Sequence, residues 1–351
     1  MADLSAIGLR RPPADPSSVD LSLSHPDAGV ARAMAALNGP VLVLGAGGKI
    51  GLHLCLMLRA AAQQSGRDLR VVAVSRFKTL RDRETFAVNG VETIAADLSV
   101  QAEVAKLPDA PTVFFLAGVK FGTSDSPGLL EAMNVIMPRL VAERYAHSLI
   151  VAFSTGCVYP FVDFRSGGAN ESTPTAPVGA YAESCLRREH AFAEVARRSP
   201  NARVVLVRLN YSVEYRYGVL LDIATKVFQR EPVDVTMGYV NVIWQRDAVS
   251  QIIQSTALAG NPPVPINITG AETHSVRSLA EKFGRVFGVK PIVVGQESPT
   301  AWLSDASESH RRFGRPAHDI DAMVGDVAAW IQNGGDTWRK PTGFEKRDGQ
   351  F

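Results

Sequence analysis

The sequence of 351 residues has few of the residues that build disulfide frameworks or metal sites. Only three cysteines occur, Cys55, Cys157 and Cys185, and none belongs to a Cys-x-x-Cys pair. The seven histidines are dispersed, without the spacing of metal ligands. We therefore expect no metal site and a reducing compartment, the cytoplasm.

Long apolar runs and an excess of one charge are also missing. No stretch reaches the roughly 20 apolar residues of a membrane span, and the first residues lack the apolar core of a secretory signal. Lys and Arg number 37 against 35 Asp and Glu, a net charge of +2. This balance gives no global electrostatic reason to expect nucleic acid or a membrane surface as a partner.

What the sequence does contain is a regular alternation of apolar runs and helical segments. Continuous apolar runs are typical of strands buried on both faces of a sheet, and helical patterns such as 129–145 and 181–198 separate them. The runs are Val41–Gly45, Leu69–Ser75, Thr112–Gly118, Ser148–Ser154 and Ala202–Asn210. This order predicts an α/β fold with a doubly wound parallel sheet.

Three regions follow from this pattern. Residues 1–38 are expected to form an amino-terminal arm, irregular at first and then helical from an N-cap at Ser24. Residues 39–210 are expected to form the doubly wound domain. After Asn210 the strict alternation ends, so residues 211–351 are expected to form mainly a smaller substrate-binding domain, with some strands returning to the sheet. We expect the arm to serve packing only.

The first apolar strand ends in a glycine-rich turn with the spacing GxxGxxG. Gly45, Gly48 and Gly51 follow the strand and open a helix, and Lys49 and Ile50 complete the turn. Glycines permit a tight turn and let backbone N–H groups approach a pyrophosphate, while the helix amino terminus favours negative charge. This context predicts a nicotinamide dinucleotide site on a Rossmann domain; the alternative is an ordinary glycine-rich turn.

The end of the second strand bears on the choice of cofactor. Ser75 is followed by Arg76 and Lys78, and no acid occurs until Asp82. An acid here would bind the ribose hydroxyls of NAD, whereas basic residues can meet the extra phosphate of NADP. Together with Lys49, these residues favour NADP, with NAD as the alternative.

Further segments make the chain resemble the extended short-chain dehydrogenase/reductase family, also called the NAD-dependent epimerase/dehydratase family, over roughly residues 41–270. They are the pair Asp97-Leu98, the strand-end loop Leu116–Lys120 and the segment Ser154–Tyr159. The resemblance implies an NAD(P)-dependent enzyme. It also implies a homodimer formed through the helices that carry Asn134 and Tyr181.

The resemblance also implies roles for single residues. Asp97 and Leu98 would contact the adenine, and Ala117 and Gly118 would lie beside the cofactor. Lys120 matches a lysine that contacts the cofactor in UDP-galactose epimerase.

On the substrate side, Thr155 matches the hydroxyl residue that holds the substrate oxygen. Asn134 matches a common family asparagine, and Arg208 and Asn210 match a strand-end pair beside the substrate. We assign Asn134 and Asn210 to substrate binding.

The catalytic YxxxK motif of that family is altered. Tyr181 is present, but Cys185 replaces the lysine whose charge lowers the pKa of the tyrosine from about 10. Three interpretations stay open: another cation substitutes, Tyr181 acts as a general acid, or the protein binds cofactor without turnover. For the substitute we prefer Lys120 over Arg188, which lies two turns along the helix, roughly 10 Å away.

The substrate side departs from the nucleotide-sugar members. Val240 stands where those members have an arginine that contacts the diphosphate. The tyrosine-rich stretch from Tyr211 to Tyr217 could bind polyol hydroxyls, with Arg216 pairing with a carboxylate; the alternative is a surface loop. We expect hydride transfer on a small carbohydrate-like molecule, a sugar, sugar acid or polyol. The alternative is a catalytically impaired NAD(P)-binding regulator or scaffold.

Overall fold

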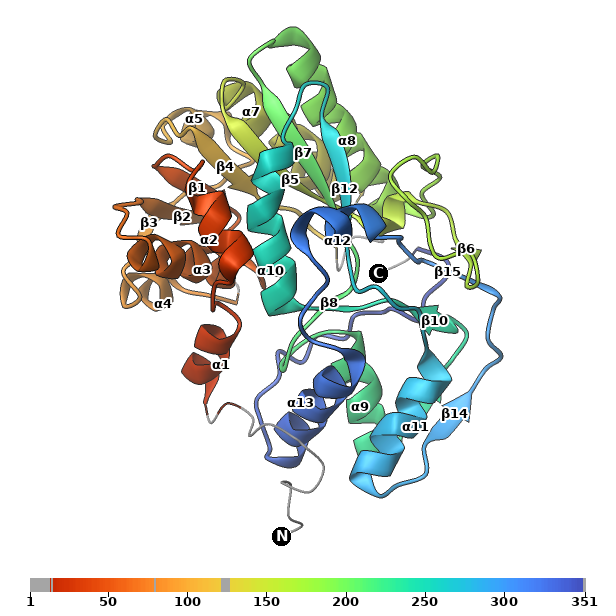
Figure 1. Cartoon of the computed structure of the whole chain (residues 1–351). Helices are drawn as coiled ribbons and strands as arrows, with labels where there is room; N and C mark the ends of the chain where they lie inside the picture. The colour runs from red at the N-terminus through yellow and green to blue at the C-terminus, as the bar shows by residue number, and fades with distance from the viewer. Residues whose placement is uncertain (1–12, 14, 79, 121–126, 350–351) are drawn as a thin grey trace.

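The computed structural model describes residues 13, 15–78, 80–120 and 127–349, so the first twelve residues of the predicted arm lie outside it. Over the described residues the centre is a seven-stranded sheet in the order β12-β7-β5-β4-β1-β2-β3 (Figure 1). Every neighbouring pair is parallel. The strands are β1 (Val41–Leu44), β2 (Val71–Ser75), β3 (Glu92–Ala95), β4 (Thr112–Phe115), β5 (Leu149–Thr155), β7 (Arg203–Leu209) and β12 (Val264–Ile268). The predicted doubly wound fold is confirmed.

Both faces of this sheet are covered, which explains the continuous apolar runs. Val41 and Val43 face one core, and Leu42 and Leu44 face the other, because successive strand side chains point to opposite faces. The first core lies under α2 (Ala28–Met34), α3 (Gly51–Gln64), α4 (Arg83–Ala87) and α10 (Gln245–Gln254). The second lies under α5 (Gln101–Ala105), α7 (Met137–Arg144) and α8 (Ala180–Arg198). Helix α6 (Pro127–Glu131) and the π-helix η2 (Ala132–Ile136) precede α7.

A separate core forms where the chain leaves the sheet after β7. It is built by α9 (Val219–Gln229), α11 (Val276–Phe287) and α13 (Ile320–Gln332), which gather below the sheet in Figure 1. In α11, Val276, Leu279, Ala280 and Phe283 are buried at the spacing of one helical face. Between α9 and α11 the chain returns to the sheet as β12, as predicted for strands beyond residue 210.

The remaining strands are short and lie outside the large sheet. Four two-stranded pairings join β8 (Ser212–Val213) to β11 (Ile243–Trp244), β9 (Pro232–Asp234) to β14 (Ile292–Val294), β10 (Tyr239–Val240) to β13 (His274–Ser275), and β6 (Val162–Asp163) to β15 (Thr300–Ala301). The remaining elements are α12 (Ser307–Phe313) and the 3-10 turns η3 (Gly156–Val158) and η4 (Ser255–Leu258). Among the described residues, no helix combines the length and apolar character needed to cross a membrane.

The amino-terminal arm is more helical than predicted. The stretch 16–18, expected to be irregular, instead begins helix α1 (Pro16–Ser22), because Asp15 caps the helix and Pro16 stands at its first position. The second helix begins after Asp27, whose carboxylate accepts the Val30 N–H at 2.9 Å, so the prediction of Ser24 as N-cap is wrong. The Ser24 hydroxyl instead donates to a carbonyl of the preceding helix.

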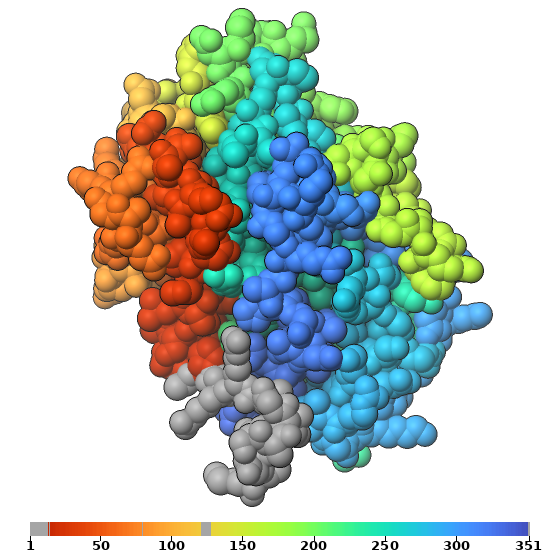
Figure 2. Space-filling view, in the orientation of Figure 1, coloured from red at the N-terminus to blue at the C-terminus, as the bar shows by residue number. Residues whose placement is uncertain are grey.

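The arm joins the two cores. Met34 of α2 packs in the core under α3 and α10, while Val19 and Leu23 of the α1 segment pack with α9 and α13. Figure 2 shows the arm, in red, against the teal surface of α10. The predicted packing role is therefore visible, and it extends to both halves of the chain.

Candidate functional site

The turn after β1 is built from glycines that the backbone requires. Gly45 has a φ of +86°, and a Cβ there would lie 2.6 Å from the backbone nitrogen of Ala117, beyond β4. A Cβ on Gly51 would lie 2.3 Å from the carbonyl oxygen of Ala46. The turn therefore passes close to β4 at the point where the strand order reverses, which is where doubly wound sheets bind ligands.

A groove opens at this reversal point. It holds about 170 Å³ and brings together most of the predicted cofactor residues. Its lining includes Gly45, Gly48, Ser75, Arg76, Lys78, Asp97, Leu98, Ala117 and Gly118. We call it the glycine groove.

One charged pair lies in the glycine groove. The half-exposed Arg76 guanidinium lies 3.5 Å from a carboxylate oxygen of Asp97. The Ser99 hydroxyl and amide donate to that carboxylate and, with Arg76, hold its pKa below the usual value. The groove thus offers glycine backbone, cations and one ionised acid, a set that fits a dinucleotide.

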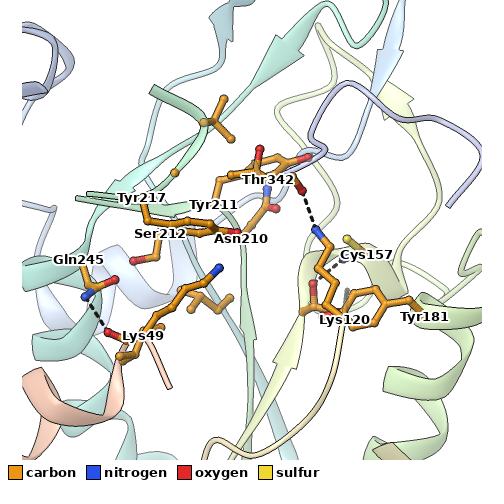
Figure 3. Close-up of a pocket in the computed structure, with 15 residues that line it drawn as sticks. Lys49, Lys120, Cys157, Tyr181, Asn210, Tyr211, Ser212, Tyr217, Gln245 and Thr342 are labelled. Atoms are coloured by element: carbon orange, nitrogen blue, oxygen red, sulfur yellow. Dashed lines mark hydrogen bonds between the residues drawn. The ribbon is translucent and has the colours of Figure 1, made fainter. Parts of the chain in front are cut away.

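A second cavity of about 210 Å³ adjoins the glycine groove, because the loops 45–51 and 116–120 contribute to both. We call it the substrate pocket (Figure 3). It brings the predicted residues Thr155, Tyr181 and Lys120 together with Asn210 and Tyr211. Its other lining residues are Lys49, Ile50, Cys157, Leu209, Ser212, Tyr217, Gly218, Val219, Gln245 and Thr342.

The phenol of Tyr181 is held in its protonated form. Burial, and then the neighbouring Cys185 and Cys157, raise its pKa well above the usual value. The Arg188 guanidinium opposes this rise. Cys185 is fully buried, and burial raises the pKa of its thiol as well. No positive charge therefore stands at the position of the missing lysine itself.

Two basic side chains lie near Tyr181. The Lys120 ammonium is 5.8 Å from the centre of the tyrosine ring and donates to the Thr342 carbonyl at 3.3 Å. Arg188 is buried, and its guanidinium packs against Gly118, where a Cβ would lie 2.2 Å from Nη2. Helical side chains lean toward the amino terminus, which brings Arg188 closer than its distance along the sequence suggests.

Asn134 is not in the substrate pocket where we expected it. It is fully buried in η2; its oxygen accepts hydrogen bonds from the Val119 amide and Arg188, and its nitrogen donates to the Val119 carbonyl and Ser184. Because these bonds occupy both ends of the amide, Asn134 positions the loop that carries Lys120.

Arg216 is also placed differently from the prediction. Its guanidinium is buried and donates to Asp20 of the arm at 2.7 Å and to Glu214. It does not line the substrate pocket, so the predicted pairing with a substrate carboxylate is wrong. The arginine is used to join the arm to the segment that follows β8.

Lys49 corrects a further prediction. We expected its charge beside Arg76, but Lys49 does not line the glycine groove. Its side chain points into the substrate pocket (Figure 3). Its ammonium lies 3.0 Å from the centre of the Tyr217 ring. Burial, and then the charges of Lys120 and Lys340, lower the pKa of Lys49 to about 7.

A chain of hydrogen bonds ties Lys49 to the arm. Gln245 donates from Nε2 to the Lys49 carbonyl at 3.4 Å and lies 2.5 Å from Nδ1 of His53. On its other side, Nε2 of His53 lies 2.9 Å from Asp20. Because burial lowers the pKa of His53, the imidazole is neutral: it accepts from Gln245 and donates to Asp20.

Of the two remaining strand-end residues, Asn210 lines the substrate pocket and Arg208 does not. Asn210 lines the pocket and donates to Asn241 at 2.8 Å. Arg208 is buried in a bidentate pair with Glu189 and donates to Tyr159, so it supports the sheet rather than the ligand.

Sequence reasoning missed one wall of the pocket. Thr342 comes from the polar tail, where no motif marks it, and it is buried against Asp222 through two hydrogen bonds. Gln245 lines the pocket, while the neighbouring Trp244 is buried in the core, as its residue type favoured. The described residues contain no group of three or more His, Cys, Asp or Glu able to hold a metal ion.

Comparison with known proteins agrees with this geometry. Residues 41–213 match the model of the NAD dependent epimerase/dehydratase family. A search of the curated proteins finds no significant match.

Solved structures with the same fold include three that hold NAD. MoeE5 in complex with UDP-glucose and NAD has a TM-score of 0.67 at 20% identity, covering 84% of this chain and 99% of its own. A variant of UDP-glucuronic acid 4-epimerase from Bacillus cereus, in complex with a fluorinated UDP-sugar and NAD, has a TM-score of 0.68 at 17% identity. The match covers 84% of this chain and 99% of that one. WbmG of Bordetella bronchiseptica, in complex with NAD and UDP, has a TM-score of 0.67 at 19% identity. The match covers 86% of this chain and 97% of that one.

Proposed function

We propose, from the match of residues 41–213 to the model of the NAD dependent epimerase/dehydratase family, that this chain is an NAD(P)-dependent oxidoreductase or epimerase/dehydratase. Its substrate would be a sugar, sugar acid or polyol. The observation that carries this proposal is the placing of Thr155 and Tyr181 in one pocket that adjoins the glycine groove. Neither the fold nor the groove alone would identify a reaction.

The chain's own residues would bind, orient and transfer a proton. Backbone amides of the glycine turn and the first turn of α3 would hold the pyrophosphate, and Arg76 and Asp97 would hold the adenosine half. When bound, the nicotinamide supplies hydride transfer. The Thr155 hydroxyl would orient the reacting oxygen of the substrate, and Tyr181 would exchange its proton.

The state of Tyr181 favours one direction. A phenol whose pKa is raised by burial is protonated at neutral pH, so it can donate a proton to a carbonyl oxygen. Reduction needs that donor, whereas oxidation needs the phenolate. We therefore propose carbonyl reduction as the favoured direction at neutral pH, with Lys120 and Arg188 supplying charge near the developing alkoxide.

We also propose NADP as the preferred cofactor. Arg76 and Lys78 both line the glycine groove beyond the end of β2, where an acid would favour NAD. The three solved structures described above contain NAD, so NAD is the alternative.

The assembly and location remain proposals that follow from the family. A homodimer would form through α7 and α8; Leu129 and Ile136, just before α7, are large apolar side chains exposed at 42% and 48%. A cytoplasmic location would suit the three cysteines, which are free and buried.

The test is turnover. Purified protein with NADPH or NADH would be screened by nicotinamide absorbance against sugars, sugar acids, polyols and their carbonyl forms. We expect turnover with one class, and a loss of about 100-fold or more in Tyr181→Phe without loss of cofactor affinity. Tyr145→Phe, which removes a buried phenol outside the pocket, is the matched control and should keep the wild-type rate.

A second candidate function rests on Cys185. Because a neutral thiol stands where the family has its lysine, the chain could bind cofactor as a regulator without catalysis. Tight cofactor binding with no turnover on any panel member would favour this function over the enzyme.

A further inference from the structure

One wall of the substrate pocket carries a glutamine whose amide is held from behind. Gln245 is the first residue of α10, and only 2% of its surface is exposed. Its side-chain nitrogen lies 3.4 Å from the Lys49 carbonyl oxygen and 2.5 Å from Nδ1 of His53. A glutamine nitrogen has two hydrogens, so these two bonds use its whole capacity to donate.

The Lys49 carbonyl determines which way this amide faces. A carbonyl oxygen can only accept, so the Gln245 atom beside it is the nitrogen, and the same nitrogen donates to Nδ1 of His53. The proton of the buried imidazole is therefore on Nε2, 2.9 Å from a carboxylate oxygen of Asp20. The Oε1 atom of Gln245 is left to face the cavity, on the side of Ser212 (Figure 3).

A second polar group lies on the same wall. Ser212 lines the pocket, and its buried hydroxyl has no hydrogen-bond partner among the described residues. Strand β8, which carries it, pairs with β11, so Ser212 stands opposite Ile243, two positions before Gln245. Buried hydroxyls are normally satisfied. Because a serine side chain rotates between staggered positions, this hydroxyl can turn toward a group bound in the cavity.

An acceptor at this place selects the chemistry of the group that it meets. Because the carbonyl oxygen of Gln245 carries no hydrogen, it binds a donor such as a hydroxyl and repels an ionised carboxylate or phosphate oxygen. A sugar hydroxyl can donate to that oxygen while it accepts from Ser212, since a hydroxyl both donates and accepts. Gln245 and Ser212 lie on one side of the pocket and Tyr181 on the other (Figure 3). The two residues would therefore meet a part of the substrate away from the reacting carbon.

We propose that Oε1 of Gln245 accepts a hydrogen bond from a substrate hydroxyl away from the reacting carbon, and that Ser212 donates to the same hydroxyl. His53 and Asp20 are positioning residues, because they hold the amide with its oxygen toward the pocket. This inference rests on the proposed function and narrows its substrate class. The substrate carries a second hydroxyl, whether it is a free molecule or linked to a nucleotide, and simple aldehydes and ketones lack this contact.

Two small probes test this contact without knowledge of the natural substrate. They are 1,5-anhydro-D-glucitol and tetrahydropyran-2-methanol, which share a ring and a hydroxymethyl group, but only the first has ring hydroxyls. Each is titrated into the protein loaded with NADP or NAD, and the side-chain amide signal of Gln245 is followed by nitrogen-15 NMR. We expect the first probe to move this signal and to bind at least about fivefold more tightly, because one hydrogen bond contributes roughly that much.

The variants isolate the two polar groups. Gln245→Leu keeps the bulk but removes the acceptor, so it should abolish the preference for the hydroxylated probe and leave cofactor affinity within about twofold. Ser212→Ala should reduce the preference about twofold or more, and it tests the contact even where the glutamine variant does not fold. Gln251→Leu is the matched control: Gln251 is a buried glutamine of the same helix, bonds to the Gly314 carbonyl outside the pocket, and should keep the wild-type preference.

The positioning role of His53 has a spectroscopic signature. The nitrogen-15 spectrum of the histidines should show the His53 proton on Nε2 and a bare Nδ1, because Gln245 donates to Nδ1. His53→Leu should lower the preference for the hydroxylated probe without weakening cofactor binding. A merely structural role would lower both.

Several outcomes would overturn the inference. Equal binding of the two probes, or binding of neither, would show that no hydroxyl is recognised. An unchanged preference in Gln245→Leu, or a proton on Nδ1 of His53, would show that Oε1 does not face the ligand. Weaker cofactor binding in Gln245→Leu would assign the glutamine to the cofactor instead. Tyr181-dependent turnover alongside any of these would leave the proposed function standing, whereas absence of cofactor binding would remove the proposed function itself.

Discussion

Asp20 of the amino-terminal arm and Arg216 of the segment after β8 form a buried ion pair, with 2.7 Å between Oδ1 and Nη2. The same carboxylate oxygen lies 2.7 Å from Nη2 of Arg81 and 2.9 Å from Nε2 of His53. One acid of the arm thus neutralises cations from both halves of the chain. Although burial opposes ionisation, the hydrogen bond from His53 and the charges of Arg216 and Arg81 hold the pKa of Asp20 well below its usual value.

Asp20→Asn should therefore destabilise the protein by about 3 kcal/mol at pH 7, because it leaves buried cations without their counter-charge. Urea unfolding would measure this, with the exposed Asp68→Asn as a control expected within about 0.5 kcal/mol of wild type. The stabilisation from an acid with a lowered pKa is present above its unfolded value, about 3.9, and is lost as the pH falls further. The difference in the free energy of unfolding between variant and wild type should therefore become smaller below about pH 4. A difference that stays constant with pH would contradict the ionised state assigned to Asp20.

Arg76 should set the preference for NADP. Arg76→Ala should weaken NADPH binding about 10- to 100-fold and change NADH binding less than about twofold, since only NADPH carries the extra phosphate. Fluorescence titration would measure both affinities. Arg70→Ala is the matched control, because Arg70 precedes the same strand, β2, at its opposite end and pairs with Glu92. Equal losses of affinity for both cofactors, or no loss for either, would show that Arg76 does not bind the extra phosphate.

We expect the charge of Arg188 to lower the pKa of the Tyr181 phenol. Because its charge opposes the rise in the pKa of Tyr181, Arg188→Met should move the alkaline rise of the oxidation rate to higher pH. Arg188→Lys should restore the wild-type profile. Since Arg188 also bonds to the Phe153 carbonyl and to Asn134, a merely structural role would lower the rate at every pH without moving the profile.

The sheet and the glycine groove could be predicted because local features determine them. Gly45 and Gly51 stand where a Cβ would strike the backbone, so their spacing follows from the turn itself. The apolar runs of β1 and β5 reflect burial on both faces, which a single sequence displays.

The substrate pocket could not be predicted in the same way. Thr342 reaches Lys120 across 222 positions of sequence, and nothing local in the tail signals that contact. The direction of Lys49 depends on Tyr217 and Gln245, which fold back from beyond β7. Arg216 looked available for a ligand because its partner, Asp20, lies in an arm that we expected to do no more than pack.

Because the chain returns to the sheet as β12, the dinucleotide-binding half depends on a strand from the second half, which matters for producing a truncated protein. The stretch Val264–Ile268 pairs with Val205–Leu209 along the outer side of β7. A fragment ending at Asn210 would leave that row of N–H and C=O groups open as a template for other chains, and it should precipitate on expression. A shortened protein meant to hold only the dinucleotide would have to retain the later strand, grafted through a new linker.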